Sequence, residues 1–88
     1  MSIEVRGDND VTFHVTVGGR TPTEHTVTVD PAYAQKLTGA RISTAELVER
    51  SFEFLLEREP NTSILRQFDL PVIGQYFPEY ESKMKALS

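Results

Sequence analysis

The sequence contains no cysteine among its 88 residues. Disulfide bonds and thiolate metal sites are therefore unavailable, and a cysteine nucleophile is excluded. A chain of this length has room for one hydrophobic core, which must be held by packing alone or by association with another chain. Because no linker, internal repeat or low-complexity tract divides the chain, we expect a single domain over residues 1–88.

Long hydrophobic runs are also missing. Nowhere do more than three strongly apolar residues follow one another, whereas a membrane-spanning helix needs about 20. The first residues carry acidic side chains and no apolar run of signal-peptide length. The sequence therefore predicts a soluble, cytoplasmic protein without a membrane partner.

Positive charge is in short supply. The formal net charge is −4 and the isoelectric point is near 5.0, so the average field of the protein repels phosphate and anionic lipid. This balance argues against nucleic acid as a partner, although a local basic patch could still bind it.

Recognisable reaction chemistry is absent as well. His14 and His25 titrate near neutrality when unperturbed, but strand alternation places them on opposite faces of a sheet, with His14 at the surface and His25 at the sheet rim. Asp8 and Asp10, with Asn9 between them, resemble the start of a calcium loop, yet the later ligands are missing, so we interpret them as a hairpin turn. No serine lies in a nucleophile motif. We expect no enzyme activity, no cofactor and no metal site.

What the sequence does contain is a clearly marked helix over residues 43–59. Ser43 and Glu46 have the S-x-x-E spacing of a capping box, which satisfies two backbone donors at a helix start. Pro60 biases Glu59 away from helical geometry and cannot continue the ladder. The helix should therefore end at about Glu59.

This helix carries two apolar stripes. At about 100° per residue, the first consists of Ala45, Val48, Phe52, Leu55 and Leu56, and the second of Leu47 and Phe54. A surface helix usually has one stripe, so this helix should contact two neighbours. One is a sheet, and the other is either the C-terminal helices or a second copy of the chain.

The N-terminal residues alternate with a period of two, which is typical of half-buried strands. Turn residues divide them into a three-stranded antiparallel β-meander over residues 1–29, in which we pair Val15 with Val27. The predicted apolar face seats the helix stripe that contains Phe52. Its members are Ile3, Val5, Val11, Phe13, Val15, Val17, Val27 and Val29; Thr12, His14, Thr16, Thr26 and Thr28 form the other face.

Residues 30–88 are predicted to be helical. Capping residues, prolines and apolar spacing indicate helices at about 31–38, 43–59, 63–68, 70–77 and 79–86. The expected fold class is therefore α+β: a three-stranded antiparallel β-meander followed by a long central helix and several short C-terminal helices.

One segment resembles a known family. A strand at residues 26–29, a short helix opened by Asp30 and Pro31, and a long helix opened by residues 43–46 resemble the ribbon-helix-helix DNA-binding proteins over residues 25–59. The resemblance implies a strand that pairs with its mate in a dimer, and a transcriptional regulator or antitoxin. Carried over by position, Thr26 and Thr28 would face bases, and Arg41, Ser43 and Thr44 would approach phosphate.

The second stripe favours a different function, that of a non-enzymatic protein-interaction or accessory module. If an apolar patch stays open, an unknown protein or a second copy of this chain could bury it. The candidate surface is Leu47, Phe54, Tyr76 and Tyr80. Alternatively, the C-terminal apolar residues fold back and close the core within one chain; these are Phe68, Ile73, Tyr76, Phe77 and Tyr80.

Overall fold

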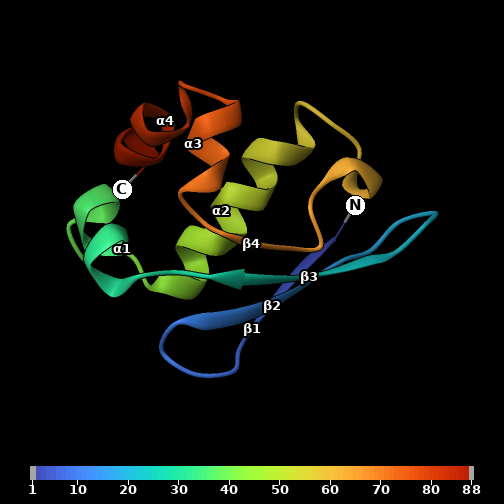
Figure 1. The fold of residues 1–88 in the computed structure, drawn as a ribbon, viewed down its shortest axis with the longest axis horizontal. Helices are drawn as coiled ribbons and strands as arrows, with labels where there is room; N and C mark the ends of the chain where they lie inside the picture. The colour runs from blue at the N-terminus through green and yellow to red at the C-terminus, as the bar shows by residue number, and fades with distance from the viewer. Residues whose placement is uncertain (1, 88) are drawn as a thin grey trace.

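A sheet covered on one face by helices forms the protein in the computed structural model, which describes residues 2–87 (Figure 1). Within these residues the sheet has four strands in the order β1-β2-β3-β4. The expected α+β class is confirmed. The strands are β1 (Ile3–Gly7), β2 (Thr12–Val17), β3 (Thr23–Thr28) and β4 (Gln67–Asp69); the helices are α1 (Pro31–Thr38), α2 (Thr44–Leu56), η1 (Asn61–Ser63, a 3₁₀ turn), α3 (Val72–Tyr76) and α4 (Tyr80–Leu87).

The first three strands are antiparallel neighbours, as the alternation predicts, but the predicted strand count is wrong. β4 pairs with β3 in parallel, with Val27 opposite Phe68, where we expected a helix over 63–68. Parallel neighbours require a crossover connection, which α1 and α2 provide. Burial alternates along this segment, as it does in a strand: Phe68 and Leu70 are buried, whereas Gln67 and Asp69 are exposed.

The predicted register between β2 and β3 is also wrong. Phe13, and not Val15, lies opposite Val27, and Val15 lies opposite His25. The shift is even, so each side chain keeps its predicted face. Thr23 and His25 lie on the covered face, where Asn61 of η1 donates to Thr23 and the Leu65 carbonyl accepts from His25.

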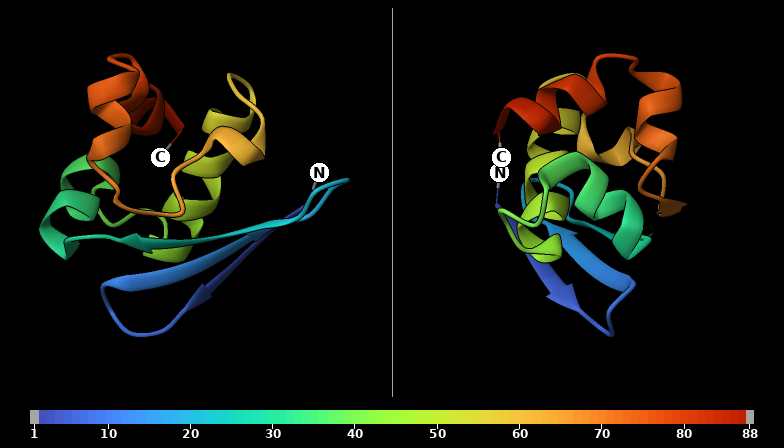
Figure 2. Two further views of the ribbon diagram at one scale, coloured as in Figure 1. Left: turned by 45° about the vertical axis from the view of Figure 1, so that its right-hand side comes forward. Right: turned by 90° about the vertical axis from the view of Figure 1, so that its left-hand side faces the viewer.

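Helix α2 lies between the sheet and the C-terminal helices. Both of its stripes are buried along the middle of the helix, and Ala45 and Leu56 at the ends of the first stripe are half-buried. On the sheet side, the ring of Phe52 lies 5.2 Å from that of His25 and 6.1 Å from that of Phe68. On the other side, Phe54 makes edge contacts with Phe77 at 5.8 Å and Tyr80 at 5.4 Å. The C-terminal segment therefore closes the core within the chain. Figure 2 shows the same layering from two further sides.

The ends of α2 differ in part from the prediction. Ser43 caps the helix by accepting from the Glu46 N–H at 3.0 Å, whereas the Glu46 carboxylate pairs with Arg50 at 3.0 Å. The helix ends at Leu56, not Glu59, because the last turn tightens: the Arg58 N–H bonds to the Leu55 carbonyl, three residues back. Helix α1 has the predicted bounds, with Asp30 as its cap.

Candidate functional site

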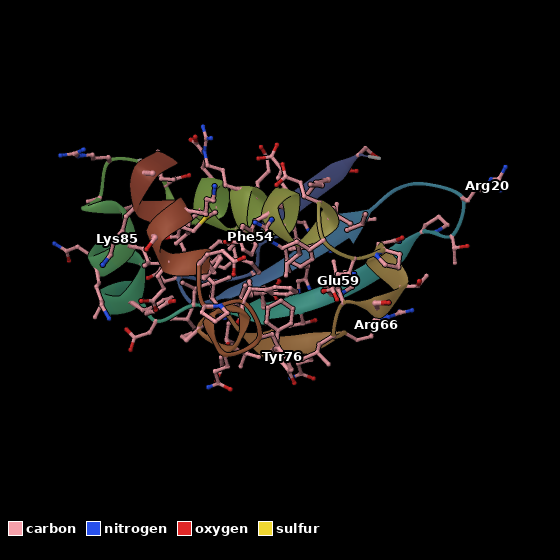
Figure 3. The ribbon with its side chains drawn as sticks, turned by 90° about the horizontal axis from the view of Figure 1, so that it is seen from above. Arg20, Phe54, Glu59, Arg66, Tyr76 and Lys85 are labelled. Atoms are coloured by element: carbon pink, nitrogen blue, oxygen red, sulfur yellow. The ribbon has the colours of Figure 1, made fainter. Side chains whose placement is uncertain are left out.

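An apolar groove of about 240 Å³ opens between the C-terminal end of α2, the segment from η1 to β4, and α3. Its buried wall includes Leu55, Ile64 and Phe68, whereas Leu65 and Tyr76 on its rim are 48% and 67% exposed. The groove is lined by Leu55, Glu59, Ser63, Ile64, Leu65, Phe68, Val72, Ile73, Tyr76 and Phe77. Figure 3 looks down on the helical layer and labels Glu59 and Tyr76.

Two prolines explain why the chain leaves a groove here. Pro60 follows α2 and begins the turn into η1, so the chain departs from the helix axis. Pro71 precedes α3, and the Ile73 N–H bonds back to the carbonyl of buried Leu70. The η1–β4 segment and α3 therefore form two separate walls, which meet at β4.

A buried chain of hydrogen bonds fixes the η1–β4 wall to β3. The Asn61 amide donates to Thr23 Oγ1 at 2.9 Å and to the Thr21 carbonyl at 2.8 Å. His25 lies 2.8 Å from Thr23 Oγ1 through Nε2 and 2.7 Å from the Leu65 carbonyl through Nδ1. Because a carbonyl can only accept, Nδ1 carries the proton and Nε2 accepts from Thr23.

His25 is therefore a structural side chain under the groove wall. Our prediction that it lies at the sheet rim is wrong, since it is almost completely buried. Burial lowers the pKa of His25 below 6.5; the hydrogen bond to Leu65 opposes this shift and the charge of Arg66 adds to it. The imidazole is held in its neutral form, with both nitrogens engaged.

Glu59 gives the groove its charge. It is half-buried at the end of α2, and among the described residues no cation lies within ion-pair distance of its carboxylate. Neighbouring Arg58 pairs with Glu57 at 3.3 Å and with Glu79 at 3.9 Å. The groove thus combines an apolar floor with an uncompensated negative charge.

A second hollow, of about 490 Å³, lies between α2 and α4. Its walls are mainly charged side chains of both signs: Arg50, Glu53, Glu57, Arg58 and Lys83. The Arg58 guanidinium lies 3.6 Å from the centre of the Phe54 ring and covers it. The smaller groove is the better candidate site, because its lining residues are mainly apolar and two of them, Leu65 and Tyr76, are exposed.

The structure corrects the candidate interaction surface that we predicted from the sequence. Leu47, Phe54 and Tyr80 are buried, and the Tyr80 hydroxyl lies 2.6 Å from Ser51 Oγ. Burial also raises the pKa of the Tyr80 phenol. Only Tyr76 is exposed, because the C-terminal aromatic residues close over the second stripe of α2.

The groove itself was not anticipated. Leu65, Glu59 and Val72 were not among the predicted site residues. The available signal is the pair Pro60 and Pro71, which interrupt helical structure on either side of the segment that forms one wall of the groove.

The residues that carry the ribbon-helix-helix resemblance make separate local contacts in the structure. Thr26 Oγ1 lies 3.4 Å from His14 Nδ1, and the Thr28 hydroxyl bonds to Asp69. Ser43 caps α2, Thr44 is half-buried, and Arg41 is exposed between α1 and α2. Both edges of β3 are paired within the chain, which leaves no edge for the corresponding strand of a mate.

His14 approaches one carboxylate, Asp8, at 3.1 Å, and in the described part of the chain no cluster of His, Asp and Glu could hold a metal ion. No helix within residues 2–87 combines the length and apolar character needed to cross a membrane. Comparison of the chain with protein-family models, curated proteins and solved structures finds no match.

Proposed function

We propose that this protein is a non-catalytic interaction module whose groove receives one large apolar side chain of a partner protein. The observation that carries the proposal is the exposure of Leu65 and Tyr76 beside an apolar floor. Elsewhere in the part of the chain that the structure describes, the other exposed large apolar side chain is that of Val11. Exposed apolar residues that gather around a hollow are typical of protein contact sites.

The size of the groove favours a side chain over a cofactor. Sites for drug-sized molecules have volumes of about 300 to 1,000 Å³, and this groove, at about 240 Å³, is smaller. A leucine, phenylalanine or methionine side chain is the kind of group that such a space would enclose.

Tyr76 has the properties of an interface anchor. Its ring offers a broad apolar surface and its hydroxyl a polar contact, and tyrosine is enriched among the residues that dominate binding energies. Because the side chain is 67% exposed, its removal should change the folding free energy little. Binding and stability can therefore be separated at this position.

Glu59 supports a more specific partner chemistry. A lysine or arginine next to the apolar anchor would compensate its carboxylate within a partly desolvated site, where charge pairing is stronger than in open water. We therefore propose that the partner segment joins a large apolar residue to a basic one.

The experiment is a selection of random peptides displayed on phage against the full chain. We expect enriched peptides to share a large apolar residue with a lysine or arginine nearby. Tyr76→Ala and Leu65→Ser should each weaken binding of a selected peptide by about tenfold or more. Glu59→Gln should reduce the preference for the basic residue.

Val11→Ala is the matched control, because Val11 is 40% exposed but does not line the groove. It should leave peptide affinity unchanged. Selected peptides that bind Tyr76→Ala and wild type equally well, or a selection without enrichment, would contradict the proposal.

A further inference from the structure

A second feature that suggests a partner is the free edge of the sheet at β1. The strand order places β1 on the outside, and the right-hand view of Figure 2 shows it, in dark blue, as the outermost strand. In an antiparallel pair, alternate residues direct their backbone groups toward the neighbouring strand and the others direct them away. The residues of β1 therefore divide into two sets.

Hydrogen bonds at both ends of β1 identify the sets. The Gly18 N–H bonds to the Ser2 carbonyl at 2.8 Å, and the Asp8 N–H bonds to the Thr12 carbonyl at 2.9 Å. Even-numbered residues of this stretch thus face β2. The backbone N–H and C=O groups of Ile3, Val5 and Gly7 therefore point away from β2, beyond the edge of the sheet.

The side chains of β1 alternate between the two faces of the sheet. Ile3 and Val5 lie on the face covered by helices and are only half-buried, whereas Glu4 and Arg6 are exposed on the opposite face. Open edges of this kind are usually protected by short strands, charged side chains, bulges, proline or a covering helix. The two charged side chains of β1, Glu4 and Arg6, have opposite signs, and α2 packs against the face of β1 that carries Ile3 and Val5. β1 has no proline, and its ladder with β2 is regular over all five residues.

We propose that β1 pairs with β1 of a second copy of this chain, antiparallel, about a two-fold axis at Val5. Ile3 then lies opposite Gly7 of the second copy, and Val5 opposite Val5. Every residue with outward backbone groups meets another such residue, so the outward donors and acceptors satisfy one another.

Charge favours this register over the two that are centred on the neighbouring residues. With the axis at Val5, Glu4 lies opposite Arg6 of the second copy and Arg6 opposite its Glu4, which is favourable across a strand pair. With the axis at Glu4 or Arg6, like charges would lie directly opposite one another, which is unfavourable. The edge is thus complementary to itself, as a two-fold interface requires, and this commits the occupant to a second copy.

The apolar face also gains from this pairing. Ile3 and Val5 are both partly exposed at the edge, and the corresponding residues of the second copy would cover them. Gly7, opposite Ile3, has no side chain that would compete for this space. The dimer would form a continuous sheet through both copies.

Sedimentation of the full chain over a range of concentrations tests the proposal. The wild type should sediment as a monomer–dimer equilibrium. Glu4→Arg and Arg6→Glu should each place like charges opposite one another and raise the dimer dissociation constant by about tenfold or more. An equimolar mixture of the two variants should restore dimerisation, because each strand then carries charges of one sign and meets the opposite sign.

Two matched controls carry the same charge changes away from the edge. The first is Glu24→Arg, on the inner strand β3. The second is Arg20→Glu, in the loop between β2 and β3; the Arg20 side chain extends far from the body of the protein in Figure 3. Neither should change the dimer dissociation constant. Val5→Pro is a second edge variant, because its lost N–H points away from β2 and edge strands tolerate proline. It should be folded by circular dichroism and sediment as a monomer.

A wild-type chain that stays monomeric at all concentrations would overturn the proposal. So would a dimer that Glu4→Arg leaves intact, or variants that fail to associate when mixed. Tyr76→Ala should leave the dimer unchanged, so this test succeeds or fails separately from that of the groove.

Discussion

His25 shows how a single side chain connects the core with the candidate site. Its Nδ1–H group bonds to the carbonyl of Leu65, whose own side chain lies exposed at the groove. Its ring also contacts Phe52, at the centre of α2. The neutral imidazole therefore ties together the sheet, the helix and the groove wall.

This arrangement predicts a pH dependence of stability. The pKa of His25 is lowered below 6.5 in the folded protein, so near and below pH 6.5 the unfolded chain binds more protons than the folded one. Stability from this group is fully present above pH 6.5 and is lost as the pH falls toward the folded-state pKa. Urea denaturation at pH 7.5 and pH 5.5 should show a lower free energy of unfolding at the lower pH.

The control for this prediction is His25→Asn, which retains a side-chain N–H for the Leu65 carbonyl but does not titrate. Acidic side chains contribute equally to both proteins, so the difference between them isolates the histidine. If the variant lost as much stability as the wild type between the two pH values, His25 would not be the source.

Among the elements, α2 shows which features of a helix can be predicted from its sequence. Its start at Ser43, its two apolar stripes and its need for two neighbours could be predicted, because capping and periodicity are local properties. Whether the second neighbour was the C-terminal segment or a second copy of the chain could not be predicted. The last turn of α2 could not be predicted either, because the Arg58 side chain also donates to the Phe54 carbonyl, at 2.9 Å. That contact depends on how the chain leaves the helix.

The cap of α2 provides a second prediction. Ser43→Ala removes the acceptor of the Glu46 N–H and should lower the free energy of unfolding by about 1 kcal/mol, as measured by urea denaturation. Ser43→Asp should retain the cap and suit the positive end of the helix dipole. Ser82→Ala, at an exposed position within α4, is the control and should change stability by much less. An equal loss in both alanine variants would contradict a capping role.

β4 is the element that sequence reasoning missed. Residues 64, 65 and 68 fit helical spacing, whereas residues 67–70 fit strand alternation, and a run this short satisfies both patterns. The choice is made by β3, more than 35 residues away in the chain, which offers an open edge to a strand that local propensity does not specify. The groove depends on this choice, and for that reason it was also missed.

At the scale of the whole molecule, the paired edges of β3 and the excess of acidic residues both argue against the DNA-binding alternative. Thr26 and Thr28 are engaged with His14 and Asp69, and not presented as a free reading surface. We predict no mobility shift of duplex DNA at low salt, where phosphate contacts are strongest. A shift that weakens steeply as salt is added would restore the ribbon-helix-helix interpretation.

The parallel pairing of β3 with β4 also constrains how the protein is made. The amino-terminal hairpins leave the ribosome first, but the strand that completes their sheet and the residues that cover Phe54 come near the other end of the chain. Until then the nascent chain carries an open β3 edge and a bare apolar stripe, which are the features that promote aggregation during synthesis. Truncation before Gln67 should therefore yield an insoluble product.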